Sequence, residues 1–426
     1  MADWFSLWLP AVVSVAGAVA GFALWSRPTL LKAWALAASL GSLALLLLSP
    51  AGVLPVLLPI AAFLSLLGQP SNEDNRAAWI LTLLLMGLGL GVLGARDGMG
   101  FVLLALLLIV LVALLYRYRA LSVSHLWQGI GVYAFGALCL VTALVAPPAM
   151  SAVAVLAVCA MLLPLVPVHA GYVAALAGLP GNLPAFLACL LPVLGFHGLL
   201  AVLPHLPGDV KAALPALGLV GAVYGALKAL AQSRVRALLA YANLSFFSIL
   251  WWYIATMRTV PSQAILYLGA VALATTGLLL GWYAIRARYG DMGLRAIRGL
   301  ANTMPRFAVL FALLALAALG LPPFGVFAGF IGMLLTPALP FSGALVVIVL
   351  VWLSASWYFL DLLQRLLFGR HRPDLRYEDL GHGEFAALLA LVLILCVMGL
   401  APVHVFQPGT PAPPAHVAGG DLSWTR

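Results

Sequence analysis

The chain has 426 residues, of which 65% are hydrophobic and 8% charged. A water-soluble domain is about 45–50% apolar and about 25% charged, so this chain lacks the polar side chains that would cover a folded surface in water. The composition therefore excludes a soluble enzyme and indicates an integral membrane protein. The net charge of +9 does not indicate a nucleic-acid partner, because no basic run is interleaved with a nucleic-acid-binding motif.

Polar residues divide the chain into fourteen apolar runs, each near the roughly 20 residues that a helix needs to cross the hydrocarbon core. The predicted spans are 6–25, 33–49, 52–68, 77–94, 99–116, 127–147, 150–166, 183–203, 211–230, 237–257, 262–285, 306–335, 341–368 and 384–404. The predicted fold class is an all-α polytopic membrane protein with about 14 transmembrane helices. We interpret the four isolated cysteines as small core residues: Cys139, Cys159, Cys189 and Cys396.

The lysines and arginines are unevenly divided between the predicted loops. If the N-terminus is outside, 17 of the 21 cations lie on the inner side, and the four on the outer side are Arg96, Lys211, Arg258 and Arg426. This division obeys the positive-inside rule and supports the count of fourteen. We therefore predict a bacterial-type inner (plasma) membrane protein with both termini on the outer side, ending in a Pro/Gly-rich tail.

Two spans contain helix-breaking residues. Pro164 and Pro167 lie at the end of the seventh span, and Pro322 and Pro323 lie within the twelfth. Proline removes a backbone hydrogen bond that lipid cannot replace, and paired interruptions are typical of transport sites. A packing kink without a site is the alternative.

The five-helix separation of these breaks predicts two five-helix repeats, and the second is inverted because five is odd. The predicted segments are 1–76 with helices 1–3, 77–203 with the first repeat, 204–368 with the second repeat, and 369–426 with the last helix and the tail.

Four motifs resemble one known family. GALKALAQSRVRALLAYANLS at 225–245 resembles the G-A-x-x-A-x-x-Q-x-D-x-K-R-x-x-A-Y-S-S-x-S motif of the proton-conducting antiporter-like subunits of respiratory complex I, its L, M and N subunits. LPLVPVHA at 163–170 is similar to the family's P-x-x-P-x-H, LGLPPFGVFAGFIG at 319–332 to its G-x-P-P-x-x-G-F-x-x-K, and RLLFG at 365–369 adds a fourth match. The family includes subunits of Mrp cation/proton antiporters, membrane-bound hydrogenases and inorganic-carbon accumulation complexes.

The resemblance covers about residues 75 to 405 and implies fourteen helices, two inverted repeats, and broken seventh and twelfth helices. It also implies proton passage along buried glutamate, lysine and histidine at mid-membrane, where such groups are kept for proton relay. In this chain the positions that match those ionisable residues are apolar: Leu106, Leu162, Val193, Phe246, Gly269, Leu273 and Met333.

Apolar replacements of this kind are expected where a once-hydrated path packs dry. We therefore predict an antiporter-like subunit of a multisubunit proton- or cation-coupled complex that supports the complex without pumping. One alternative is an active proton-conducting subunit that uses an unusual path. A second alternative is a stand-alone secondary transporter.

Three residues are candidates for a proton path: His169, His197 and Lys228. His197 lies one helical turn after Val193 and titrates near neutral pH, but it could equally face a neighbouring helix or the wet end of its span. His169 matches the family's motif histidine, where we expect it to cap backbone carbonyls. Lys228 belongs to the 225–245 motif.

Four charged residues near the inner ends of spans are candidates for contact with lipid headgroups or an acidic partner: Arg234, Arg236, Asp361 and Arg365. Asp361 and Arg365 are spaced i, i+4, so we expect them to pair. The few neutral polar groups deep in the spans are expected to form hydrogen bonds between helices: Asn182, Ser245, Thr275 and Thr276.

The sequence carries no motif for a flavin, an Fe–S cluster, a nucleotide or a metal. We predict no catalytic residues and no cofactor, and the question of enzymatic activity stays open. Redox or hydration chemistry coupled to this chain would lie on other membrane and peripheral subunits, and the expected partners are those subunits and the lipid bilayer, without nucleic acid.

Overall fold

The structure is a computed structural model. It describes residues 2–49, 52–70, 75–95, 98–118, 125–257, 262–290, 297–336, 339, 342–369 and 378–401. Within these ranges the secondary structure is helical, without strands, which confirms the predicted fold class. The Pro-rich tail and the outer cations Arg96, Arg258 and Arg426 lie outside the described residues.

The helices follow the predicted spans closely. In chain order they are α1 (Ala2–Gly21), η1 (Phe22–Leu24), α2 (Pro28–Leu47), α3 (Val53–Leu67), α4 (Arg76–Gly94), α5 (Gly98–Arg117), α6 (His125–Val145), α7 (Pro148–Leu162), α8 (Ala170–Gly178), α9 (Leu183–Val202), η4 (Leu203–His205), α10 (Gly208–Leu230), α11 (Val235–Met257), α12 (Ser262–Tyr289), α13 (Leu300–Thr303), α14 (Pro305–Leu319), α15 (Gly325–Leu334), α16 (Gly343–Leu367) and α17 (His382–Leu400).

Eleven of the described helices are long and apolar enough to cross a membrane. The shorter apolar helices are α3, α7, α14 and α15. Each of the fourteen predicted runs coincides with one helix, except that the run 306–335 covers both α14 and α15. The helix α8 lies between the seventh and eighth predicted runs and was not predicted. The number of complete crossings stays a prediction, because these shorter helices fall below the length of a full span.

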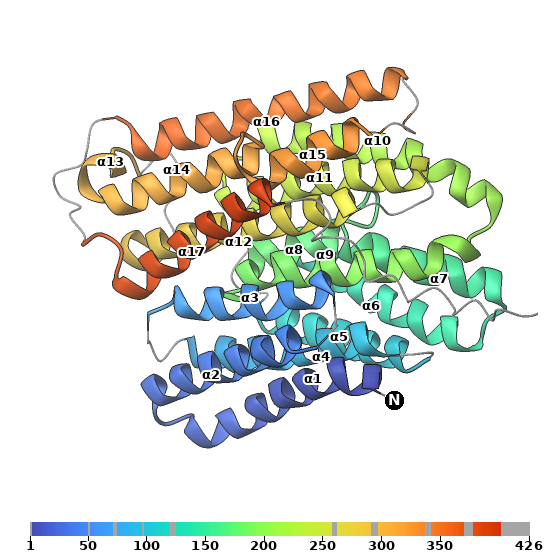
Figure 1. The fold of residues 1–426 in the computed structure, drawn as a ribbon, viewed down its shortest axis with the longest axis horizontal. Coiled ribbons are helices and arrows are strands. Elements are labelled where there is room, and N and C mark those ends of the chain that lie inside the picture. The colour runs from blue at the N-terminus through green and yellow to red at the C-terminus, as the bar shows by residue number, and fades with distance from the viewer. Residues whose placement is uncertain are drawn as a thin grey trace, which may run out of the picture.

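The long helices lie side by side, with α1 at one edge and α16 at the opposite edge (Figure 1). The apolar windows of α12 and α11 are almost entirely buried, whereas those of α2 and α16 are mostly open. Large apolar side chains such as Leu48, Val145 and Trp357 are exposed on the outside. A helix that is apolar on its outer face as well as its inner face is typical of a membrane span.

Two of the predicted spans are broken. A loop at 163–169 separates α7 from α8, and a loop at 320–324 separates α14 from α15. Gly320 ends α14 with φ +83°, a left-handed conformation that glycine adopts without a steric penalty. Both loops contain a cis X-Pro bond, Val166–Pro167 and Pro322–Pro323.

The two breaks occupy the same place in the order of elements. The series α4, α5, α6, α7/α8, α9 has its broken member fourth, and so has the series α10, α11, α12, α14/α15, α16. This is the order that two five-helix repeats would produce.

Candidate functional site

The first break is covered by neighbouring helices. Trp251 Nε1 on α11 donates a 3.0 Å hydrogen bond to the Leu163 carbonyl oxygen at the end of α7. α9 packs so closely on the same point that a Cβ on Gly195 would lie 2.4 Å from Leu163 N. The interrupted backbone therefore lies against protein, as the cost of unpaired backbone groups in lipid requires.

The apolar residues at the family's ionisable positions are mostly packed inside the molecule. Five of them are no more than 2% exposed: Leu162, Val193, Phe246, Leu273 and Met333. At Gly269 an added Cβ would lie 3.1 Å from Leu57 Cδ1 and 3.3 Å from Met398 Cε. These six positions are surrounded by the apolar core.

Leu106 is an exception, because its side chain is 45% exposed. The residue that counting from Asp97 matches to the family's glutamate therefore lies on the outer face of α5. The buried face of α5 is formed by Leu104, Leu107, Leu108, Leu111, Leu114 and Leu115. Every buried residue of α5 is therefore a leucine, so none of them supplies the ionisable group that the family has in this helix.

Neutral polar groups link the helices beside the first break. Asn243 Nδ2 on α11 donates to the Tyr172 hydroxyl of α8 at 2.7 Å, and Thr275 Oγ1 of α12 donates to Asn243 Oδ1 at 2.7 Å. Thr276 Oγ1 donates to the Ala185 carbonyl oxygen, and Ser245 Oγ to that of Ala222. The predicted role of these residues in helix-to-helix hydrogen bonding is confirmed.

His169 is the N-cap residue of α8, but its side chain makes no capping hydrogen bond. The start of α8 presents N–H groups, and the expected contact of His169 with backbone carbonyl groups stays a prediction. The imidazole lies edge-on to the Tyr224 ring, with 5.3 Å between the ring centroids. Lys228 Nζ lies 5.7 Å from the centroid of that same Tyr224 ring, so the structure brings His169 and Lys228 to one aromatic side chain.

His197 is half-buried on α9. Its neighbour Gly198 faces α7, where an added Cβ would lie 2.8 Å from Cys159 Sγ. The structure places His197 on the helix that covers the first break.

Arg236 and Arg234 have different surroundings, although only Val235 separates them. The Arg236 guanidinium donates to the Leu179 carbonyl oxygen at 2.7 Å and to that of Ala177, so it caps the C-terminal end of α8. Arg234 is exposed.

Asp361 and Arg365 form an ion pair on the outer face of α16, with 2.7 Å between Arg365 Nε and Asp361 Oδ1. Their side chains are 41% and 46% exposed. The predicted pairing is confirmed, and the pair is open to lipid or to a neighbouring subunit.

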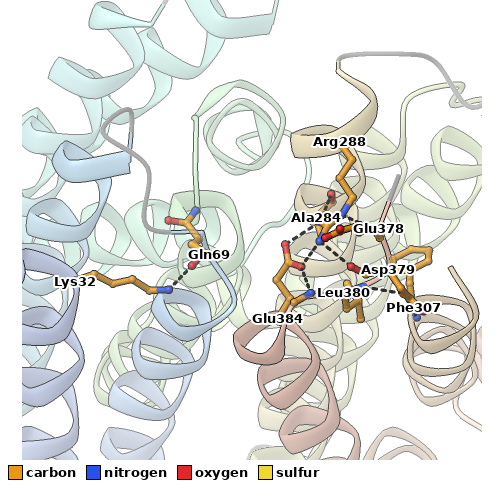
Figure 2. Close-up of polar contacts among 10 residues, drawn as sticks. Lys32, Gln69, Ala284, Arg288, Phe307, Glu378, Asp379, Leu380 and Glu384 are labelled. Carbon is orange, nitrogen blue, oxygen red and sulfur yellow. Dashed lines mark hydrogen bonds and ion pairs between the residues drawn. The ribbon is translucent and has the colours of Figure 1, made fainter. Parts of the chain in front are cut away.

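A larger ionic cluster at the ends of α12, α14 and α17 was not predicted from the sequence (Figure 2). Arg288 Nη2 and Glu384 Oε2 lie 2.6 Å apart, with side chains 17% and 9% exposed, and Arg288 Nη1 donates to Glu384 Oε1 at 2.9 Å. The Asp379 carboxylate accepts the backbone N–H groups of Arg306 and Phe307 at 2.7 and 3.1 Å. The sequence signal that could have indicated this cluster is the pair of opposite charges at the ends of the eleventh and fourteenth predicted spans, Arg288 and Glu384.

Lys32 on α2 binds the C-terminal end of a neighbouring helix, as Arg236 does for α8. Its ammonium group donates to the Leu67 and Gln69 carbonyl oxygens at the end of α3, as Figure 2 shows for Gln69. Arg76 Nη1 similarly donates to the Trp25 carbonyl oxygen at 2.9 Å. Cations thus cap helix ends, where carbonyl groups lack helical partners. Among the residues that the structure describes, no group of three or more His, Cys, Asp or Glu could hold a metal ion.

The geometry defines a class of protein: a polytopic helical membrane protein with two broken helices in corresponding positions, of the kind that transporters use. A family profile described as "NADH:quinone oxidoreductase/Mrp antiporter, TM" matches residues 98–357, which is more than half of the chain. The chain therefore belongs to the NADH:quinone oxidoreductase/Mrp antiporter transmembrane family.

Curated relatives match parts of the chain. NADH-quinone oxidoreductase subunit M of Pseudomonas aeruginosa is 28% identical over 193 residues, which cover 45% of this chain and 38% of the relative. The F(420)H(2) dehydrogenase subunit M of Methanosarcina mazei is 28% identical over 265 residues, which cover 55% of this chain and 53% of the relative. The matched region thus spans about half or less of each of these relatives.

Solved structures share the fold over most of the chain. A chain of respiratory complex I from Thermus thermophilus superposes with a TM-score of 0.76 at 23% identity, covering 92% of this chain and 95% of that one. A chain of the archaeal membrane-bound sulfane sulfur reductase gives 0.83 at 16% identity, covering 93% and 76%. A chain of the Mrp complex from a Dietzia species gives 0.76 at 19% identity, covering 92% and 50%.

Proposed function

We propose that this chain is an antiporter-like membrane subunit of a multisubunit proton- or cation-coupled complex, in which it supports the assembly and does not itself pump. The observation that carries the proposal is the burial of Leu162, Val193, Phe246, Leu273 and Met333 in the apolar core. Ionisable groups are retained in membrane interiors where they relay ions, and these positions hold none.

The distribution of the described charges supports the same conclusion. Lys, Arg, Asp and Glu lie in loops or near helix ends throughout the described ranges. The buried polar groups beside the first break are amides and hydroxyls, which change charge neither readily nor near neutral pH. A path made of these groups would contain no side chain that binds and releases a proton near neutral pH.

The partners are proposed from the relatives, several of which are named as subunits of NADH-quinone oxidoreductase or F(420)H(2) dehydrogenase. We propose that this chain likewise assembles with other membrane and peripheral subunits, which supply any redox or hydration chemistry. The exposed Arg234 and the Asp361–Arg365 pair are candidate contacts for such subunits or for lipid headgroups.

The proposed orientation has both termini outside a bacterial-type inner membrane. Its support is that the described loops between predicted spans 1 and 2, 3 and 4, and 11 and 12 are connected by hydrogen bonds. Arg76 contacts Trp25, Lys32 contacts Gln69, and Tyr283 contacts Asn75. Cation-rich loops on a shared side are expected to be cytoplasmic.

We also propose the division into 1–76, 77–203, 204–368 and 369–426, with two inverted repeats in the middle. The matching order of elements and the position of each broken helix support it.

Proton flux into liposomes tests the supporting role. The full chain is reconstituted with a pH-sensitive dye inside the vesicles, and a potassium diffusion potential is applied. We expect flux equal to that of empty liposomes. Flux above this level that His197→Ala abolishes, and that His205→Ala at the exposed outer end leaves unchanged, would contradict the proposal.

The retained broken helices favour a second candidate, an active conducting subunit. The chain of hydrogen bonds from Tyr172 through Asn243 to Thr275 joins α8, α11 and α12 beside the first break and could order water molecules. In that case Asn243→Leu would remove the flux. Absence of flux both from the chain alone and from its isolated complex would exclude this candidate.

A further inference from the structure

A cluster of buried amides lies between the ends of α3, α4 and α9, away from the broken helices. Its members are Gln69, Asn75 and Asn182, none more than 5% exposed. Each has one polar atom that is buried without a hydrogen-bond partner: Gln69 Nε2, Asn75 Nδ2 and Asn182 Oδ1. Buried polar atoms are almost always paired, with protein or with ordered water.

The hydrogen-bond network fixes which atom of Asn182 is unpaired. Asn182 Nδ2 donates to Ser65 Oγ at 3.1 Å and to Thr82 Oγ1 at 2.9 Å. Both hydroxyl hydrogens are already donated to backbone carbonyl oxygens, of Ala62 and Ala78. With both hydroxyl hydrogens on these carbonyl oxygens, the two hydroxyls accept from Asn182, so its amide nitrogen faces them and its oxygen faces away.

The orientation of Gln69 is fixed in the same way. Its Oε1 accepts a 2.8 Å hydrogen bond from the indole N–H of Trp79. Because an indole nitrogen is only a donor, the amide cannot be turned round. Gln69 Nε2 is thereby an unpaired donor, and Asn182 Oδ1 is an unpaired acceptor.

Gly181 lies directly against this cluster. An added Cβ would lie 3.4 Å from both Gln69 Nε2 and Asn75 Oδ1, and 3.1 Å from Ala78 Cβ. The glycine has φ +62°. The cluster as a whole has two unpaired amide nitrogens and one unpaired amide oxygen, and a buried water, which both accepts and donates, makes roughly three hydrogen bonds.

We propose that Gln69, Asn75 and Asn182 hold ordered water at the Gly181 turn, between the ends of α3, α4 and α9. An anion would leave the Asn182 oxygen unpaired, and a cation would leave both amide N–H groups unpaired, whereas water both accepts and donates. The water does not extend a proton path through Asn182, because the Ser65 and Thr82 hydroxyl hydrogens end on backbone carbonyls. This inference is independent of the proposed function.

A density map of the full chain in lipid nanodiscs, sharp enough to show ordered water, tests the proposal directly. We expect a peak within hydrogen-bond distance of Gln69 Nε2 and Asn182 Oδ1. Amide groups that contact each other with no peak between them would overturn the proposal.

Hydroxyl-radical footprinting by X-ray radiolysis provides a test in solution, because activated bound water oxidises nearby side chains. Trp79 is fully buried but bonded to Gln69, so we expect it to be labelled severalfold more than Met161, which is equally buried, after correction for intrinsic reactivity. Equal labelling of the two residues in the unaltered chain would overturn the proposal.

Gly181→Ala would place a methyl group against Gln69 Nε2 and Asn75 Oδ1. It should displace the water and reduce Trp79 labelling to the level of Met161. Gly290→Ala is the matched control, because Gly290 has φ +75° and no atom within 4 Å of an added Cβ. It imposes similar backbone strain without occupying the site, so labelling of Trp79 should persist. Equal effects of the two substitutions would contradict a water site at Gly181.

Discussion

At the scale of single residues, two kinds of polar contact between helices differ in where they lie. Deep in the helices they are amides and hydroxyls paired across helices, such as Asn243 with Tyr172. At helix ends they are charged groups that bind backbone or each other, such as Arg288 with Glu384. This separation follows from the cost of a charge in the bilayer, which is highest at the centre and falls toward the ends.

Glu384→Gln is expected to destabilise the protein by about 1.5–3 kcal/mol, because it removes the negative charge and one of the two hydrogen bonds that Glu384 accepts from Arg288. Glu384 Oε2 also accepts the Gly381 N–H at 2.9 Å, and the oxygen of glutamine can still accept it, so the change acts on the pairing with Arg288. Thermal unfolding of the purified chain in detergent measures the effect.

Asp361→Asn is the comparison for that measurement, since it breaks an ion pair that is 41–46% exposed. Exposed i, i+4 pairs contribute less than about 0.5 kcal/mol. A loss for Asp361→Asn equal to that for Glu384→Gln would contradict this ranking of the two pairs.

At the scale of elements, one half of each broken helix has its end away from the break bound by a side chain from another segment. Arg236 binds the carbonyl oxygens that end α8. Asp379 binds the N–H groups of Arg306 and Phe307 at the start of α14, where a carboxylate also meets the positive end of the helix dipole. The half-helices are thus held at their ends as well as by packing.

Arg236→Ala is expected to destabilise the protein by about 1.5–3 kcal/mol, because two charge-assisted hydrogen bonds to the end of α8 are lost. Hydrogen exchange of residues 170–178 should become faster. Arg234→Ala changes an exposed side chain and should stay within about 0.5 kcal/mol. Unchanged exchange in α8 for Arg236→Ala would show that this cap is not needed.

Helices α10 and α11 approach each other through three glycines on one face of α10. An added Cβ would lie 2.7 Å from Trp252 N at Gly218, 2.5 Å from Ser248 Oγ at Gly221 and 2.5 Å from Ser245 N at Gly225. Small residues at this spacing let membrane helices pack with their backbones close together.

Gly225→Ala should therefore destabilise the protein by about 1–3 kcal/mol, the usual cost of overpacking a tight contact. Gly41→Ala on α2 is the control, because no atom lies within 4 Å of an added Cβ there, and its melting temperature should not fall. Melting curves for the two variants decide the point, and a tolerated Gly225→Ala would mean that α10 and α11 can move apart.

At the scale of the whole molecule, hydrogen bonds connect several of the loops that carry cations. Of the thirteen described lysines and arginines, Lys211 is the one at the opposite end of its helix, near the start of α10. The loops that carry the others are joined through contacts such as Lys32 with Gln69. The proposed orientation therefore puts these connected loops together on the inner side of the membrane.

Cysteine labelling checks this orientation. Ser233→Cys, in the exposed turn between α10 and α11, should react with a membrane-impermeant maleimide in inside-out vesicles and not in right-side-out vesicles. Asp209→Cys, exposed at the start of α10, should show the reverse. The parent chain, in which Cys139, Cys159 and Cys189 are buried, provides the background. Labelling of both variants from one side would contradict the arrangement.

The sequence by itself determined the fold class, the approximate helix bounds, the two breaks and the family. Apolar runs of span length and prolines such as Pro164 and Pro322 are local signals, and they need no knowledge of neighbours. The i, i+4 pair Asp361 and Arg365 was predicted for the same reason.

Only the tertiary structure decided which side chains meet across the molecule. Arg236 on the end of α8, Asp379 on the start of α14 and the amide cluster around Gly181 each join segments far apart in the sequence. Leu106 shows the same limit, because a position aligned by counting residues faced outward once the helix was packed. Residue spacing shows which side chains share a face of one helix. Which neighbour that face contacts depends on how the helices are arranged in the folded chain.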